Sequence, residues 1–125
     1  MKWDIVKKDK GYKFNQKMKK NFEFGQVCTL KESIDYSKGA TVSKIVTKNQ
    51  CGSTTLFSFD KGQNLSEHTA PFDAIAIILD GKCEISIAGR QNSLIEGQMI
   101  IMPANIPHAL EAVEAFKMLL VMIKA

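Results

Sequence analysis

From about Gly39 onward, hydrophobic and polar positions fall into short runs that turn residues separate. Such runs, rich in β-branched, aromatic and aliphatic residues, predict β-strands. They cover residues 41–47, 54–59, 75–79, 83–88, 93–95, 99–102, 108–113 and 116–123. The run 75–79 ends at Asp80-Gly81, a dipeptide typical of hairpin turns. Because no helical periodicity separates the runs, the pattern predicts an all-β sandwich or barrel rather than an α/β fold.

Two neighbouring runs differ in the way their residues alternate. In the run 75–79 every residue is apolar, so both faces of the strand are apolar. Strands of this kind are usually covered on both sides, and we therefore predict sheet-on-sheet or subunit packing, with a homodimer as the assembly. The run 83–88 alternates instead, with Cys83, Ile85 and Ile87 on one face and Glu84 and Ser86 on the other.

The first 38 residues lack this alternation and are interpreted as an N-terminal arm. A partly helical arm, with the helix in residues 4–21, and an irregular arm both fit the pattern. We predict that residues 1–38 pack on the barrel or on a partner subunit, and that residues 39–125 form the barrel. Residues 1–20 hold eight lysines against two aspartates, a net charge of +6, whereas the rest of the chain carries −2. Lysine-rich ends are commonly solvated, although such an arm can also contact an acidic partner.

Composition narrows the class of protein further. Hydrophobic residues make up 45% and charged residues 24% of the 125 residues, which is typical of one globular domain. No apolar run approaches the roughly 20 residues of a membrane helix, and nothing reads as a signal peptide. Three scattered cysteines fit free thiols and a cytoplasmic protein. Basic residues do not follow the predicted strands, so we expect no nucleic acid as partner and no membrane.

Two stretches combine turn residues with the two histidines of the chain. The residues that mark them are Gly62, His68 and Gly81 in the first stretch, and Gly97, Pro103 and His108 in the second. Asn105 follows Pro103 closely and can adopt the left-handed backbone conformation. The order and spacing of these residues resemble the two sequence motifs of the cupin superfamily, in particular compact bacterial single-domain cupins. The resemblance covers residues 40–123 and implies a jelly-roll barrel, also called a double-stranded β-helix.

The resemblance also implies a metal site, from which this sequence departs. In metal-binding cupins the matching positions carry three histidines and a glutamate, whereas here they are His68, Ala70, Ala74 and His108. Two imidazoles fall short of the three or four protein ligands that bound metals usually have. A divalent transition metal would therefore need further donors, such as Asp73, turned inward by a bulge, or Cys83.

The function that this pattern favours is the binding of a small molecule in an apolar barrel, with metal weak or absent. The expected polar features are His68 and His108. The expected ligand-binding walls include Ala70, Ala74, Leu110, Phe116 and Met118, and further apolar candidates are Ala76, Ala112 and Met122. Two alternatives stay open: a metal-dependent cupin enzyme of the dioxygenase or isomerase type, and an interaction module acting through the dimer and the basic arm. The sequence does not decide whether any reaction is catalysed.

Overall fold

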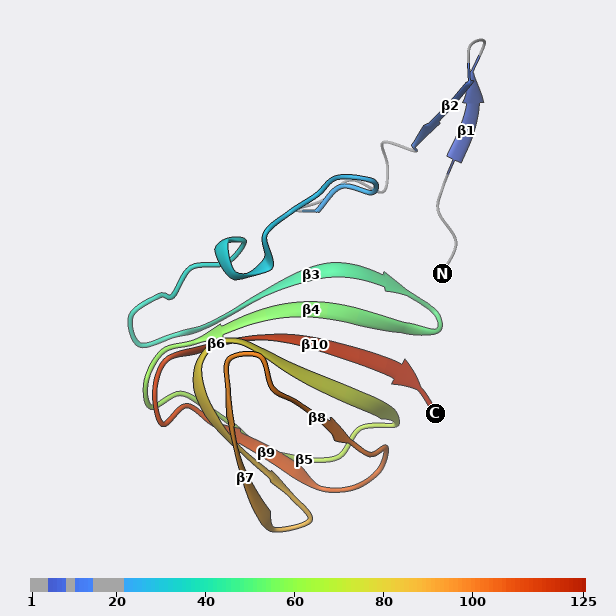
Figure 1. The fold of residues 1–125 in the computed structure, drawn as a ribbon. Coiled ribbons are helices and arrows are strands. Elements are labelled where there is room, and N and C mark those ends of the chain that lie inside the picture. The colour runs from blue at the N-terminus through green and yellow to red at the C-terminus, as the bar shows by residue number, and fades with distance from the viewer. Residues whose placement is uncertain (1–4, 9–10, 15–21) are drawn as a thin grey trace.

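The computed structural model describes residues 5–8, 11–14 and 22–125, and these are all-β apart from one 3-10 turn (Figure 1). The elements are β1 (Ile5–Lys8), β2 (Gly11–Phe14), η2 (Leu30–Glu32), β3 (Thr41–Asn49), β4 (Gly52–Phe59), β5 (Asn64–His68), β6 (Phe72–Ile87), β7 (Arg90–Ile95), β8 (Met99–Met102), β9 (His108–Glu111) and β10 (Phe116–Lys124). Strands β3 to β10 form one curled antiparallel sheet, in the order β3-β4-β10-β6-β9-β5, with β7 and β8 also paired to β6. The prediction of an all-β barrel is confirmed.

The long strand β6 connects the two layers of the curled sheet. Its first half, from Phe72 to Gly81, pairs with β10, and residues 74–77 of that half also pair with β8. Its second half, from Lys82 to Ile87, pairs with β7 and β9. We call the layer around the first half the β10 layer and the layer around the second half the β9 layer.

The expected hairpin at Asp80-Gly81 is wrong, because β6 continues through this point as one strand. Gly81 has a φ of 76°, and a β-bulge shifts the pairing with β10 between Lys117 and Met118. A side chain at Gly81 would also meet the carbonyl oxygen of Ala115 at 1.9 Å. Glycine and the bulge therefore bend the strand from one layer into the other instead of reversing it.

The hydrophobic core lies between the two layers. Inward-facing residues of β6 before the bend, such as Ile78, and after it, such as Ile85, are almost completely buried. Near the bend, the rings of Phe59 and Phe116 stack with their centroids 4.6 Å apart. These rings and Cys83, which has no exposed surface, fill the barrel at the end formed by the bend.

The described part of the N-terminal arm does not form the helix that the sequence allowed in residues 4–21. Strands β1 and β2 pair antiparallel with each other, so residues 5–8 and 11–14 are extended, and the remainder of the proposed helix lies outside the described residues. Residues 22–40 are irregular apart from η2, which agrees with the irregular alternative. None of the described helices is long and apolar enough to cross a membrane.

Residues 30–36 of the arm pack on the outer face of the β10 layer. Ile34 is 1% exposed, and Leu56, which faces outward from β4, is completely buried. The hydroxyl of Ser58 donates a hydrogen bond to the carbonyl oxygen of Asp35 at 2.8 Å. The arm therefore covers part of a sheet face that would otherwise be exposed to solvent.

Candidate functional site

His68 and His108 lie side by side at the end of the barrel opposite the bend. His68 ends β5 and His108 begins β9, and the two residues are paired in register. Their ring centroids are 4.4 Å apart, with an edge-to-face angle of 64°. His108 is 6% exposed, whereas His68 is exposed. The prediction that the two imidazoles come together is thus confirmed.

Both imidazole rings are held by hydrogen bonds to the backbone two residues earlier. Nδ1 of His68 is 2.7 Å from the carbonyl oxygen of Ser66, and Nδ1 of His108 is 3.2 Å from that of Ile106. Because a carbonyl oxygen only accepts, each Nδ1 carries the proton and donates it. In the neutral form of each ring, Nε2 is then left as an acceptor for a ligand.

Local backbone contacts join the two motif regions around the histidines. The amide of Asn105 donates to the carbonyl oxygen of Ala70 at 2.8 Å. Asn105 has a φ of 63°, the left-handed conformation expected from the sequence. The neighbouring amide of Ala104 donates to Oδ1 of Asp73 at 2.9 Å. The loop before β9 is therefore fixed to the segment between β5 and β6, and this positions His108 against His68.

The inward-facing residues of β10 become more exposed with distance from the bend. On β10, Phe116 and Met118 have no exposed surface, whereas Leu120 and Met122 are half-buried. Met122 is paired with Ala74, which is 2% exposed, and Ala74 is also paired with Met102 of β8.

The predicted pocket walls occupy different depths of the barrel. Leu110 is 3% exposed, and it belongs to one continuous core with Ala74, Phe116 and Met118. Ala70, which precedes β6, is half-buried. The assignment of these residues as ligand-binding walls stays a prediction, with Ala70 and Met122 nearest to solvent.

The described donor groups do not fit the metal site that the resemblance implies. Asp73 is exposed and bonded to the loop at Ala104, and it does not join the histidines in a metal-binding group. Burial raises the pKa of the Cys83 thiol to about 12, which keeps the thiol protonated at neutral pH. Within residues 22–125, no group of three or more His, Cys, Asp or Glu side chains could hold a metal ion. The expected extra donors Asp73 and Cys83 therefore do not complete a ligand set with His68 and His108.

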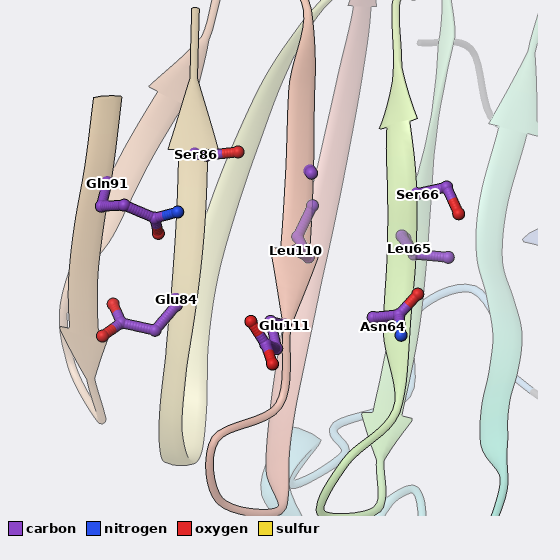
Figure 2. Close-up of a pocket in the computed structure, with 9 residues that line it drawn as sticks. Asn64, Leu65, Ser66, Glu84, Ser86, Gln91, Leu110 and Glu111 are labelled. Atoms are coloured by element: carbon purple, nitrogen blue, oxygen red, sulfur yellow. The ribbon is translucent and has the colours of Figure 1, made fainter. Parts of the chain in front are cut away.

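A second feature lies on the outer face of the β9 layer and is shown in Figure 2. It is a hollow of about 280 Å³, which we call the polar hollow. The lining residues are Asn64, Leu65, Ser66, Glu84, Ser86, Gln91, Ala109, Leu110 and Glu111, from strands β5, β9, β6 and β7. Its side chains are mainly amides, hydroxyls and carboxylates, in contrast to the apolar interior.

The polar hollow contains two carboxylates on adjacent strands. Glu84 is paired in register with Glu111, and Glu111 is paired in turn with Asn64. Glu84 accepts a hydrogen bond from the hydroxyl of Ser93 at 2.5 Å. Among the described residues, no cationic side chain forms an ion pair with either glutamate. Sequence reasoning placed Glu84 on a polar face but missed the hollow, because its formation depends on the register between strands distant in sequence.

Comparison with known proteins identifies a family and solved structures that are similar to this chain. A family model described as "Cupin domain" matches residues 55–124. A solved structure of a conserved protein of unknown function from Streptococcus pyogenes is 42% identical, with a TM-score of 0.80. That match covers 85% of this chain and 93% of the other. The comparison with curated proteins found no match.

Two further solved structures are similar to this chain. A cupin 2 conserved barrel domain protein from Leptotrichia buccalis is 40% identical, with a TM-score of 0.73. That match covers 74% of this chain and 45% of the other, so this chain spans less than half of that protein. A cupin superfamily protein from Desulfitobacterium hafniense is 24% identical, with a TM-score of 0.79 over 85% of this chain and 97% of the other. The last similarity shows the fold alone.

Proposed function

The chain belongs to the cupin family, and from this premise we propose that it binds a small, partly apolar molecule at the end of its barrel opposite the bend. His68 and His108 are the polar anchors of the proposed site. The observation that carries the proposal is the pairing of the two imidazoles, each with its Nδ1 fixed to a backbone carbonyl. A fold of this kind hosts many activities, so the argument rests on the site.

The chemistry of the histidines indicates the kind of ligand. An imidazole that donates from Nδ1 to a backbone carbonyl can accept a hydrogen bond at Nε2, which suits a hydroxyl or N–H donor of a ligand. Leu120 and Met122 are half-buried on the inner side of β10, where they favour an apolar portion of the ligand. A mostly apolar cavity with a few fixed polar groups is the usual form of a small-molecule site. We propose that binding is direct, since the described donors do not complete a metal site.

A fragment screen by ligand-observed NMR tests this function. Fragments that combine a hydroxyl or N–H donor with an apolar group should bind the wild-type protein. His68→Ala and His108→Ala should each weaken the affinity for these fragments at least about tenfold, because each removes an acceptor that the ligand requires. Gln91→Ala changes an exposed polar residue of the outer hollow and serves as the matched control.

The folded state of each variant is checked by circular dichroism, because His108 is buried. Equal affinity of all fragments for the wild type and for both histidine variants would refute the proposal. Repeating the screen with a chelator distinguishes direct binding from binding that depends on a metal. Fragments that bind only without chelator would indicate a metal-mediated site and would contradict direct binding.

A further inference from the structure

We propose that residues 29–36 of the arm form a strap that opens as a unit while the barrel stays folded, and that salt favours the open form. We call these residues the strap. In the closed form the strap covers the outer face of β4, where Leu56 and Ser58 have no exposed surface. Opening exposes this face to solvent. The inference concerns a movement of the arm and is independent of the proposed ligand site.

The backbone of the strap takes no part in the sheet. Among the described residues, its backbone–backbone hydrogen bonds are internal to the 3-10 turn: the Glu32 amide donates to the carbonyl oxygen of Thr29 and the Ser33 amide to that of Leu30. Strand β4 beneath it is paired with β3 on one side and with β10 on the other. Because opening breaks none of the hydrogen bonds between these strands, the strap can leave without unfolding the barrel.

Side chains of the sheet hold the strap along its length. Three of them, from β3, β4 and β10, donate hydrogen bonds to carbonyl oxygens of alternate strap residues. The pairs are Lys44 with Ser33 at 3.0 Å, Ser58 with Asp35 at 2.8 Å, and Lys117 with Lys31 at 2.6 Å. Between these contacts lies Ile34, the only buried side chain of the strap, at 1% exposure. Contacts this closely spaced are expected to form and break together.

Charged groups close the strap against the bend of β6. The ammonium of Lys31 is 2.9 Å from Oε1 of Glu96 and 3.3 Å from Oδ1 of Asp80. The Tyr36 hydroxyl donates to the same Asp80, and the ammonium of Lys117 lies 5.1 Å from the centre of the Tyr36 ring. We call these five residues the clasp. Since Lys31 and Glu96 are exposed, dissolved salt screens their attraction and weakens the closed form.

The chain on either side of the strap is suited to act as a hinge. Residues 25–29 and 35–39 are all exposed. Gly25 and Gly39 lie at the outer ends of these stretches with φ values of 78° and 68°, a conformation that glycine adopts without strain. Beyond Gly39 the chain is fixed, because the amide of Asp60 donates to the carbonyl oxygen of Ala40 at 3.1 Å. Hinges are commonly a few loop residues of this kind.

Thiol labelling distinguishes opening of the strap from unfolding of the barrel. The test protein carries Ile34→Cys together with Cys28→Ser and Cys51→Ser, which remove the two exposed thiols. The native thiol of Cys83, buried in the barrel, then reports unfolding of the barrel itself. Labelling by uncharged iodoacetamide, followed by mass spectrometry, should be at least about tenfold faster at position 34 than at Cys83.

Salt dependence tests the clasp. Raising sodium chloride from about 0.01 M to about 1 M shortens the Debye length from about 30 Å to about 3 Å. Labelling at position 34 should then accelerate about three- to fivefold, whereas labelling at Cys83 should not accelerate. Glu96→Gln in the same protein should accelerate labelling at position 34 about threefold at low salt and reduce the response to salt.

A second glutamate provides the matched control. Glu32 lies in the strap itself, is exposed and belongs to none of the described ion pairs. Glu32→Gln therefore makes the same change of charge without removing a clasp contact. It should leave labelling at position 34 unchanged.

Three results would overturn the inference: equal labelling rates at position 34 and Cys83, a rate at position 34 that salt does not raise, or equal effects of Glu96→Gln and Glu32→Gln. Hydrogen exchange of the wild type, followed by mass spectrometry, covers the case in which Ile34→Cys does not fold or itself loosens the strap. Exchange in residues 29–36 should accelerate with salt, while exchange in residues 52–59 of β4 should not. An equal response of the two segments would show that the strap does not open separately.

Discussion

Strand β6 presents a different outer surface on each side of the bend at Gly81. Before the bend, its outward residues include Ile75 and Ile77, which are half-buried among other aliphatic side chains. After the bend, Glu84 and Ser86 face outward and line the polar hollow (Figure 2). A single strand thus carries two kinds of surface within one continuous sheet.

The inner faces of the two layers do not share this difference. Ala76 and Ile78 before the bend and Cys83 and Ile85 after it are all 1% exposed or less. The barrel interior therefore requires only that the inward-facing side chains of the strand be apolar. The outward-facing residues differ with the surroundings of each layer: residues 30–36 of the arm cover part of the β10 layer, whereas polar residues line the hollow on the β9 layer.

The largest expected difference in stability between the two layers comes from a substitution in the arm. Ile34→Ala should lower the free energy of unfolding by about 2–4 kcal/mol, because Ile34 is 1% exposed and its loss leaves a cavity under the arm. Ile95→Ala, on the β9 layer, should cost no more than about 0.5 kcal/mol, because the side chain is half exposed. Urea denaturation measures both. Similar losses in the two variants would show that the arm is not part of the β10 layer's core.

A smaller effect is expected from the polar contacts that fasten the arm at the edge of the β10 layer. The Tyr36 hydroxyl donates to Oδ2 of Asp80 at 2.6 Å. This hydrogen bond is the largest cause that holds the pKa of the Asp80 carboxyl below its ordinary value; desolvation opposes it, and Lys31 adds a weaker contribution in the same direction as Tyr36. A lowered folded-state pKa contributes stability above the unfolded pKa, about 3.9, and loses it as pH falls through the folded pKa.

Acid should therefore loosen the arm, and Tyr36→Phe should reduce this sensitivity. Between about pH 5 and pH 2, we expect the free energy of unfolding to fall less in Tyr36→Phe than in the wild type. The difference should be no more than about 1 kcal/mol, because solvent screens these exposed groups. Glu114→Gln, an exposed change outside the arm contacts, is the control. Identical acid slopes in Tyr36→Phe and the wild type would exclude this hydrogen bond as a source of acid sensitivity.

The fold was largely predictable because most strands bury a face of apolar side chains, which leaves a recognisable pattern in the sequence. The run 99–102 coincides with β8, and the run 54–59 lies within β4. Strand β5 was missed because its residues Asn64–His68 are mainly polar and exposed. The bend at Gly81 was predicted as a hairpin because the local pattern does not reveal that β6 continues beyond it and pairs there with β7 and β9. The dipeptide Asp80-Gly81 marked a change of chain direction, and the pairing between distant strands decided that this change is a bend and not a reversal.

The candidate site was predictable in part. The spacing of the two motifs brought His68 and His108 together correctly. Their Nδ1 contacts were not predictable, because these depend on loop geometry such as the bulge between Leu65 and His68. The polar hollow combines residues of four strands, and no local sequence signal specifies that arrangement.

The smallest predicted effect concerns the carboxylates of the polar hollow. Glu84 and Glu111 are paired across β6 and β9 without a described cationic partner, and like charges directly opposite each other destabilise a sheet. Glu111→Gln should therefore raise the free energy of unfolding by about 0.2–0.5 kcal/mol at low salt. The gain should diminish at about 1 M salt, where the Debye length is only about 3 Å.

Urea denaturation at the two salt concentrations measures this gain, with Glu114→Gln as the control for a lone exposed glutamate. A gain in Glu111→Gln alone, reduced by salt, would identify the repulsion as its source. A loss of stability in Glu111→Gln would instead mean that the carboxylate makes a favourable contact within the β9 layer. That result would contradict the contrast between a covered apolar layer and a water-facing polar one, because the Glu111 carboxylate would then stabilise the folded β9 layer.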